Sequence, residues 1–153
     1  MDHDITISNG LAWSPDQTTM YYVDSPTKSV SAFDYVAASG DISNKRVVIT
    51  LNAEQGFPDG MTIDCEGMIW LAHWAGQRVC RWDPLRGELL EEYNTPAPHT
   101  SCCCFGGPDL SDLYVTTARK GLSQHQLDAY PLSGHLFRMK TNVVGMPTYA
   151  YGG

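Results

Sequence analysis

Short runs of alternating apolar and polar residues follow one another along the whole chain, separated by Gly, Pro, Asp and Asn at close intervals. No window keeps apolar residues at helical spacing, so the pattern predicts an all-β protein. The run ELLEEY, residues 88–93, would also fit a helical turn if taken alone, but its neighbours favour a strand. The expected strands are residues 10–14, 19–24, 29–34, 46–51, 60–64, 68–74, 78–83, 88–93, 101–105, 112–117, 134–140 and 147–151.

These strands repeat in groups. Three segments align, each with an opening strand, a tight polar turn, an aromatic-rich second strand and a third strand that ends in Phe or Trp. The alignment puts Asn9, Asp59 and Thr100 at one position, at intervals of 50 and 41 residues. Four-stranded units of that length are typical of β-propeller blades. We therefore expect one half-propeller unit over residues 1–153, with blades at approximately 5–52, 53–97 and 98–153.

Composition narrows the class of protein. A chain of 153 residues with 42% hydrophobic residues can bury one core and is too short for two independent domains. The net charge is −7 and no basic stripe occurs, which argues against nucleic acid as a partner. The first ten residues are acidic and polar, unlike a signal peptide, and no run has membrane-spanning length. We expect a cytoplasmic protein without a membrane partner.

The five cysteines, Cys65, Cys80 and Cys102 to Cys104, match neither a disulfide framework nor a zinc pattern. Their number is odd, and neighbours on one strand point to opposite faces. Free Cys packs as a small hydrophobe, so we expect small buried thiols.

Asn9 and Asp59 are the strongest candidates for chemistry. The first strand of a propeller blade lines the central channel, so the aligned positions would converge on one pocket. A carboxylate and an amide carbonyl suit a hard cation such as Ca²⁺ or Mg²⁺. The alternative is structural, because Asn and Asp before Gly form turns by bonding their own backbone.

Several motifs together resemble the C-terminal half of the gluconolactonase/regucalcin (senescence marker protein) family. They are ISNGLAWSPD, MYYVDS, VSAFDY, SGDISNKRV, PDGMTIDCEGMIWLA, RVCRWDP, TSCCCFGGPDLSDLYVTTAR and GMPTYAYGG, and they cover the chain in order. The resemblance implies a six-bladed propeller that hydrolyses sugar lactones with one divalent cation. It makes Asn9 a metal ligand and Asp59 both a ligand and the general base. Ca²⁺ is the favoured ion, with Mg²⁺, Mn²⁺ and Zn²⁺ as alternatives.

The chain also departs from that family. Members are roughly twice as long, and their N-terminal half supplies a glutamate ligand and the polar groups that hold the sugar. A non-catalytic half-propeller, acting as a Ca²⁺ or small-molecule binder or as an assembly module, is therefore the alternative function. Three blades leave two open flanks, and a second copy related by a two-fold axis would cover both in a six-bladed ring. The other possibilities are a separately encoded N-terminal half as the partner, or a chain cut from a longer protein. Met1 lies just before a blade boundary, which favours a natural or deliberate start.

Three further residues are candidates for substrate binding. Thr100 and Ser101 at the third aligned position would donate hydrogen bonds to a ligand, or else satisfy their own backbone. His73 and its neighbour Trp74 would reach the channel mouth, or else cap a loop. Residues 120–134 form the longest expected loop, polar and flanked by glycines like a lid, although ordinary loop variability would explain this as well.

Overall fold

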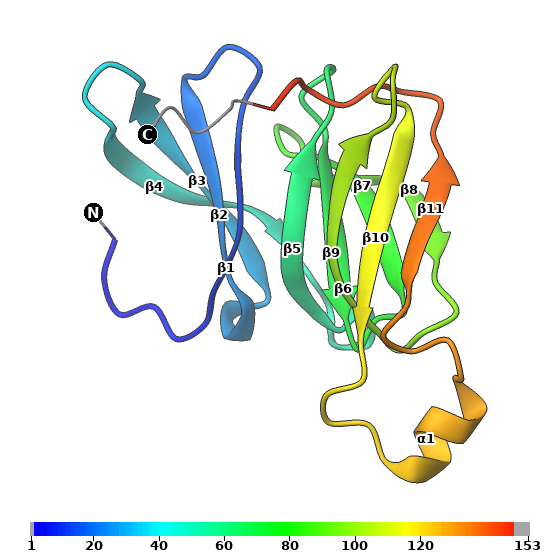
Figure 1. The fold of residues 1–153 in the computed structure, drawn as a ribbon. Coiled ribbons are helices and arrows are strands. Elements are labelled where there is room, and N and C mark those ends of the chain that lie inside the picture. Colours follow the sequence, from blue (N-terminus) through cyan, green and yellow to red (C-terminus); the bar gives the residue numbers. More distant parts are fainter. Residues whose placement is uncertain (1, 149–153) are drawn as a thin grey trace.

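Three antiparallel sheets lie side by side in the computed structural model, which describes residues 2–148 (Figure 1). The first sheet contains β1 (Ser8–Trp13), β2 (Thr19–Asp24), β3 (Ser29–Val36) and β4 (Asp41–Thr50). The second contains β5 (Phe57–Ile63), β6 (Ile69–Trp74), β7 (Arg78–Asp83) and β8 (Glu88–Asn94). The third contains β9 (His99–Gly106), β10 (Asp112–Ala118) and β11 (Leu136–Lys140). The predicted all-β fold is confirmed.

Each sheet is a meander, in which every strand pairs with the next one along the chain. The ELLEEY run forms a strand, β8, as its neighbours indicated. Within the described residues the third sheet has three strands rather than four. The strand expected at 147–151 falls mostly outside the described part, and Pro147 and Thr148 lie in no strand.

Two apolar cores separate the three sheets. Strand β6 contributes to both, since Ile69 and Leu71 pack towards the first sheet while Trp70 packs towards the third. A strand buried on both faces is expected to be mostly apolar, which explains the run IWLA at the start of β6; His73 is the buried polar exception. The second sheet is therefore enclosed between its neighbours. The outer faces of the first and third sheets have no neighbouring sheet within the described residues.

A buried carboxylate holds the turn between β5 and β6. Asp64 is fully buried, and its Oδ2 accepts hydrogen bonds from Trp70 Nε1 at 2.9 Å and from Arg81 Nε at 2.8 Å. Its Oδ1 accepts the backbone N–H groups of Glu66 and Met68, both at 3.0 Å. Every lone pair of this carboxylate faces a donor, so the charge is compensated although it is out of water.

The segment after β11 returns to the second sheet (Figure 1). Gly145 forms a β-bridge with Asp64, and Cys65 donates its backbone N–H to the carbonyl of Val144 at 2.9 Å. Met146 then packs against the first core. This segment thus ties the last described residues to the first two sheets.

The connection from β10 to β11 contains a short helix, α1 (Gln124–Ala129), where we expected only a loop. Ser123 and Gln126 form a capping box at its N-terminus, which is the local signal that the sequence reading missed. Two 3₁₀ turns, Ser25–Thr27 and Ala53–Gln55, complete the described elements. Within residues 2–148 no helix is long and apolar enough to cross a membrane.

The expectation of small buried thiols is correct for only two of the five cysteines. All five are free; Cys80 and Cys103 are buried, while Cys65, Cys102 and Cys104 are exposed. On β9 the alternation of a strand turns Cys103 into the core and its two neighbours to the other side.

Candidate metal and substrate site

A β-bulge recurs in the innermost strand of each sheet. In β1 it lies between Ser8 and Leu11, and in β5 between Pro58 and Met61, so Asn9 and Asp59 are each the first of two residues that face a single residue of the next strand. Both residues are followed by glycine. A bulge bends its strand and redirects a side chain out of the regular alternation. The equivalent bulges therefore turn Asn9 and Asp59 to the same side of the molecule.

The two glycines let the inner strands touch. A Cβ on Gly10 would lie 2.6 Å from the backbone oxygen of Asp59, and one on Gly60 would lie 2.8 Å from Cα of Cys102. Such distances are too short for a side chain at either position, so β1 packs backbone to backbone on β5, and β5 on β9. Convergence of the three inner strands follows directly from these glycines.

The third equivalent position is Ser101. The register of β9 shifts between Thr100 and Cys102, which leaves Ser101 in the bulge. The expected equivalence of Thr100 with Asn9 and Asp59 is therefore wrong by one residue. In a strand a shift of one residue reverses the face of a side chain, so the difference matters.

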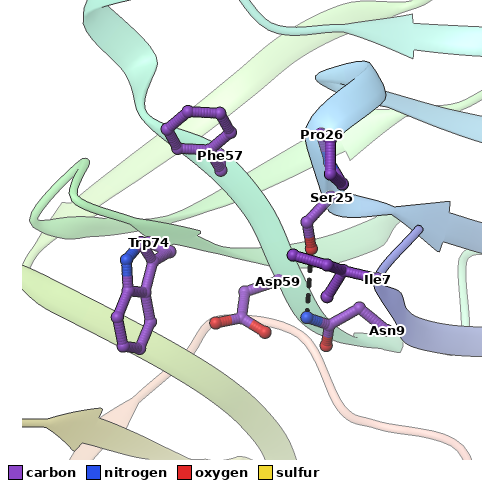
Figure 2. Close-up of a pocket in the computed structure, with 7 residues that line it drawn as sticks. All are labelled: Ile7, Asn9, Ser25, Pro26, Phe57, Asp59 and Trp74. Atoms are coloured by element: carbon purple, nitrogen blue, oxygen red, sulfur yellow. Dashed lines mark hydrogen bonds between the residues drawn. The ribbon is translucent and has the colours of Figure 1, made fainter. Parts of the chain in front are cut away.

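Asn9 and Asp59 line one pocket of about 380 Å³ between the first and second sheets. Figure 2 shows the Asp59 carboxylate between the Trp74 ring and the Asn9 side chain. Asn9 Nδ2 donates a hydrogen bond to Ser25 Oγ at 3.1 Å, which leaves its carbonyl oxygen available. The lining residues are Ile7, Asn9, Ser25, Pro26, Phe57, Asp59 and Trp74.

The carboxyl of Asp59 lies in a largely apolar surrounding. Burial raises its pKa above the ordinary value, while hydrogen bonds from the Asn9 side chain and the Gly60 backbone oppose this shift. A carboxylate with a raised pKa is a stronger base than one in water. It would also gain from a nearby positive charge, because the charged form is the one that burial penalises.

The chemistry of this pair fits part of a cation site. One carboxylate and one amide carbonyl are oxygen donors of the kind that Ca²⁺ and Mg²⁺ prefer. Two side chains supply only a fraction of the six to eight ligands around Ca²⁺. Among residues 2–148, no three or more His, Cys, Asp or Glu residues gather as a metal site. Asn9 and Asp59 can thus hold a hard cation only together with water, substrate or donors from elsewhere.

The other predicted substrate contacts lie outside this pocket. Thr100 is fully buried, and its hydroxyl is 2.6 Å from that of Thr95. Ser101 is partly exposed and lies 2.9 Å from the Thr116 hydroxyl on the neighbouring strand. Their roles in substrate binding stay predictions. Of these two residues, only Ser101 is accessible to a ligand.

His73 is fully buried at the end of β6. Its Nδ1 is 2.8 Å from the Gln55 carbonyl, while its Nε2 has no hydrogen-bond partner. Burial lowers the pKa of His73 to about 4, so the ring is neutral near pH 7. The structure thus places the side chain against the loop before β5, and a role in substrate binding remains a prediction.

Of the two aromatic walls of the pocket, the sequence singled out Trp74 as a residue at the channel mouth, and Phe57 was missed. Phe57 directly precedes the Pro-Asp-Gly motif, and Trp74 follows His73. A signal was present, since antiparallel pairing brings the start of β5 beside the end of β6, where Phe57 pairs with Trp74. Ile7 and Ser25 meet within the first sheet, where the Ser25 backbone N–H donates to the Ile7 carbonyl at 3.2 Å, and Pro26 follows in the 3₁₀ turn. Their approach to Asp59 depends on the packing of the first sheet on the second.

Stacked antiparallel meanders whose first strands converge define a propeller-type protein, with an oxygen-donor pair at that convergence. The chain belongs to the family described as "SMP-30/Gluconolactonase/LRE-like region", whose model matches residues 1–119. Regucalcin of Oryctolagus cuniculus is 46% identical over 150 residues, which are 97% of this chain and 50% of that protein.

Two solved structures are similar over nearly the whole chain. A calcium-binding protein, regucalcin, from Agrobacterium tumefaciens has a TM-score of 0.88 and 35% identity, over 94% of this chain and 48% of that one. A luciferin-regenerating enzyme has a TM-score of 0.87 and 40% identity, over 95% of this chain and 48% of that one. The chain thus spans about half the length of the relatives it matches.

Proposed function

We propose that this chain forms half of a metal-dependent hydrolase of sugar lactones or related esters, active when a second half closes a six-bladed ring. The observation that carries the proposal is the shared bulge that brings Asn9 and Asp59 into one pocket. Membership of the gluconolactonase family supports the reaction type. The fold alone would not, because one fold serves many functions.

In this proposal Asn9 and Asp59 hold a divalent cation, with Ca²⁺ favoured, through the amide carbonyl and the carboxylate. When bound, such an ion polarises a carbonyl oxygen as a Lewis acid. Asp59 acts as the general base, a role that needs a carboxylate kept ionised by the nearby cation. It takes a proton from a water that attacks the lactone carbonyl carbon. The ring C–O bond then breaks, the alcohol oxygen receives a proton, and the product is the hydroxy acid.

Ser25 has a positioning role in this scheme. Its hydroxyl accepts the hydrogen bond from Asn9 Nδ2, which fixes which end of the Asn9 amide faces the pocket. With its NH₂ group donating to Ser25 and to the Asp59 carboxylate, Asn9 has its carbonyl oxygen left for a cation. Ser25 itself is buried at the start of a 3₁₀ turn, so this orientation is held by the fold.

A second copy is the proposed partner that closes the ring. The outer face of the first sheet exposes Leu11, Trp13 and Val47, by 45%, 37% and 59%, and that of the third sheet exposes Leu136. Two arcs related by a two-fold axis would place each of these faces against the other. The channel would then contain two Asn9 and two Asp59 side chains. A separately encoded N-terminal half is the alternative partner.

A non-catalytic role in Ca²⁺ or small-molecule binding is the second candidate. It is favoured by the donor count, since in the described chain only Asn9 and Asp59 supply oxygen side chains suited to a cation at the pocket. The similar protein from Agrobacterium tumefaciens is called calcium-binding. Binding without turnover of any lactone would support this candidate.

The test is hydrolysis of gluconolactone with Ca²⁺, Mg²⁺, Mn²⁺ or Zn²⁺ added, or with a chelator. We expect activity in the fraction with a mass near twice 16.9 kDa, and its loss on chelation. Asp59→Asn should lower kcat at least about 100-fold, because it removes the base. Asp34→Asn, which changes an exposed carboxylate paired with Arg46, is the matched control. Metal-dependent activity that survives Asp59→Asn would overturn the assignment of the base.

A further inference from the structure

The pocket has a polar floor and apolar walls. Its polar side chains are Asn9, Asp59 and Ser25, and Ser25 is already bonded to Asn9. The remaining walls are Ile7, Pro26, Phe57 and Trp74 (Figure 2). The reacting group of a ligand would therefore lie at this polar floor, and the remainder of the ligand would lie against the hydrocarbon walls.

Both aromatic walls are held in place by contacts outside the pocket. The Trp74 ring stacks on His99 of the third sheet, with ring centroids 4.1 Å apart and planes 19° from parallel. The ammonium group of Lys28 lies over the Phe57 ring, 4.6 Å from its centroid. Walls fixed before a ligand arrives cost little ordering entropy on binding, which favours affinity.

A polyhydroxylated ligand is poorly matched to these walls. A sugar ring can lay a C–H face on one aromatic ring, but its hydroxyls would still meet Ile7, Pro26 and the other ring, where the described lining offers no polar side chain. A hydroxyl that leaves water without gaining a hydrogen bond weakens binding. A flat hydrocarbon group instead gains from burial and from stacking.

We propose that this pocket binds a lactone or cyclic ester that carries a flat apolar substituent, with the substituent against Phe57 and Trp74 and the reacting carbonyl at Asn9 and Asp59. The inference rests on the proposed function for its reaction, but the apolar subsite stands on the geometry of the walls alone. It narrows the substrate class from sugar lactones to lactones with an aromatic or similar apolar group.

The first arm of the test compares γ-phenyl-γ-butyrolactone with gluconolactone as substrates. We expect a KM for the phenyl lactone at least about tenfold lower, as the burial of one ring implies. Phe57→Ala should raise this KM about tenfold, and by several times more than it raises the KM for gluconolactone. Leu89→Ala removes an equally exposed apolar side chain, 41% against 39%, on the far strand of the same sheet and is the matched control.

The second arm measures binding without turnover. The corresponding lactam, γ-phenyl-γ-butyrolactam, is titrated calorimetrically into the chain, into Phe57→Ala and into Trp74→Leu, with xylitol as the polar comparison. We expect binding of the lactam, weakened about tenfold in both variants, and none of xylitol at equal concentration. A thermal melt shows whether each variant is folded.

The two experiments distinguish a failure of the proposed hydrolase from a failure of the proposed apolar subsite. If neither lactone is hydrolysed but the lactam binds through Phe57 and Trp74, the subsite stands and the proposed hydrolase falls. If gluconolactone is hydrolysed as well as or better than the phenyl lactone, the hydrolase stands and the subsite is overturned. Absence of lactam binding, or binding indifferent to both variants, overturns the subsite as well.

Discussion

Gly10 packs directly against Asp59, so that a single methyl group on Gly10 would come within 2.6 Å of the Asp59 backbone oxygen. This contact joins the first sheet to the second at the point where both inner strands bulge. It also sets the distance between the two candidate ligands, since Asn9 immediately precedes Gly10. The fold and the candidate site therefore depend on the same close approach.

Gly10→Ala should separate β1 from β5. The new methyl group meets backbone atoms of Asp59 and Met61, which cannot move aside as a side chain can. We expect the free energy of unfolding to fall by about 1–3 kcal/mol, the usual cost of overpacking, and cation binding at Asn9 and Asp59 to weaken. Urea denaturation and calorimetric titration with Ca²⁺ measure the two effects.

Gly106→Ala is the control for this prediction. There the added methyl group meets only the edge of the Tyr114 ring, at 3.0 Å, and a side chain can give way. Its cost should be clearly smaller. A loss for Gly10→Ala no larger than that for Gly106→Ala would contradict the tight backbone contact between β1 and β5.

Asp64→Asn should be strongly destabilising. The change leaves the buried Arg81 without the full charge that compensates it, and places an NH₂ group where Trp70 and the backbone now donate. Breaking one partner of a buried ion pair costs about 3–5 kcal/mol. Glu66→Gln alters an exposed partner of the same arginine, and should cost less than about 1 kcal/mol in the same denaturation experiment.

His73 should make the protein less stable in mild acid. The pKa of His73 is about 4 when folded and 6.5 when unfolded, so between these values the unfolded chain binds more protons. The stabilisation is complete above pH 6.5 and is lost as pH falls towards 4. From pH 7.5 to 5 the loss should be about 2 kcal/mol.

His73→Asn isolates this effect, because the amide keeps a donor for the Gln55 carbonyl but does not titrate. The difference in unfolding free energy between the two proteins should change with pH by the stated amount. If the difference in unfolding free energy did not change with pH, His73 would not be buried in its neutral form.

Cys104 reports on closure of the ring. Its thiol lies on the outer face of the third sheet, whereas exposed Cys65 lies in the turn between β5 and β6. In a ring of two copies Cys104 should react with a thiol reagent at least about tenfold more slowly than in the monomer, since closure covers that face. Cys65 serves as the internal control, with an unchanged rate. Equal rates for Cys104 in monomer and dimer would mean that the copies associate elsewhere.

Local patterns accounted for much of the fold. Turn residues and alternation located the first eleven strands, and the ELLEEY run was correctly assigned from its neighbours. Helix α1 was missed because its capping box was not recognised within a polar stretch. Thr100 was placed one residue too early because bulges insert residues that a simple alignment of strands does not count.

The sequence by itself determined the all-β class, the repeating units and the pairing of Asn9 with Asp59, because each is encoded in alternation, turn residues and periodic motifs. Only the tertiary structure decided what surrounds that pair. The apolar walls come from Ile7, Pro26, Phe57 and Trp74, which lie far apart in the chain and meet through the packing of two sheets. The exposure of Cys102 and Cys104 likewise depends on which face of β9 receives a neighbour. Contacts between distant segments follow from how whole sheets pack, and no local pattern records them.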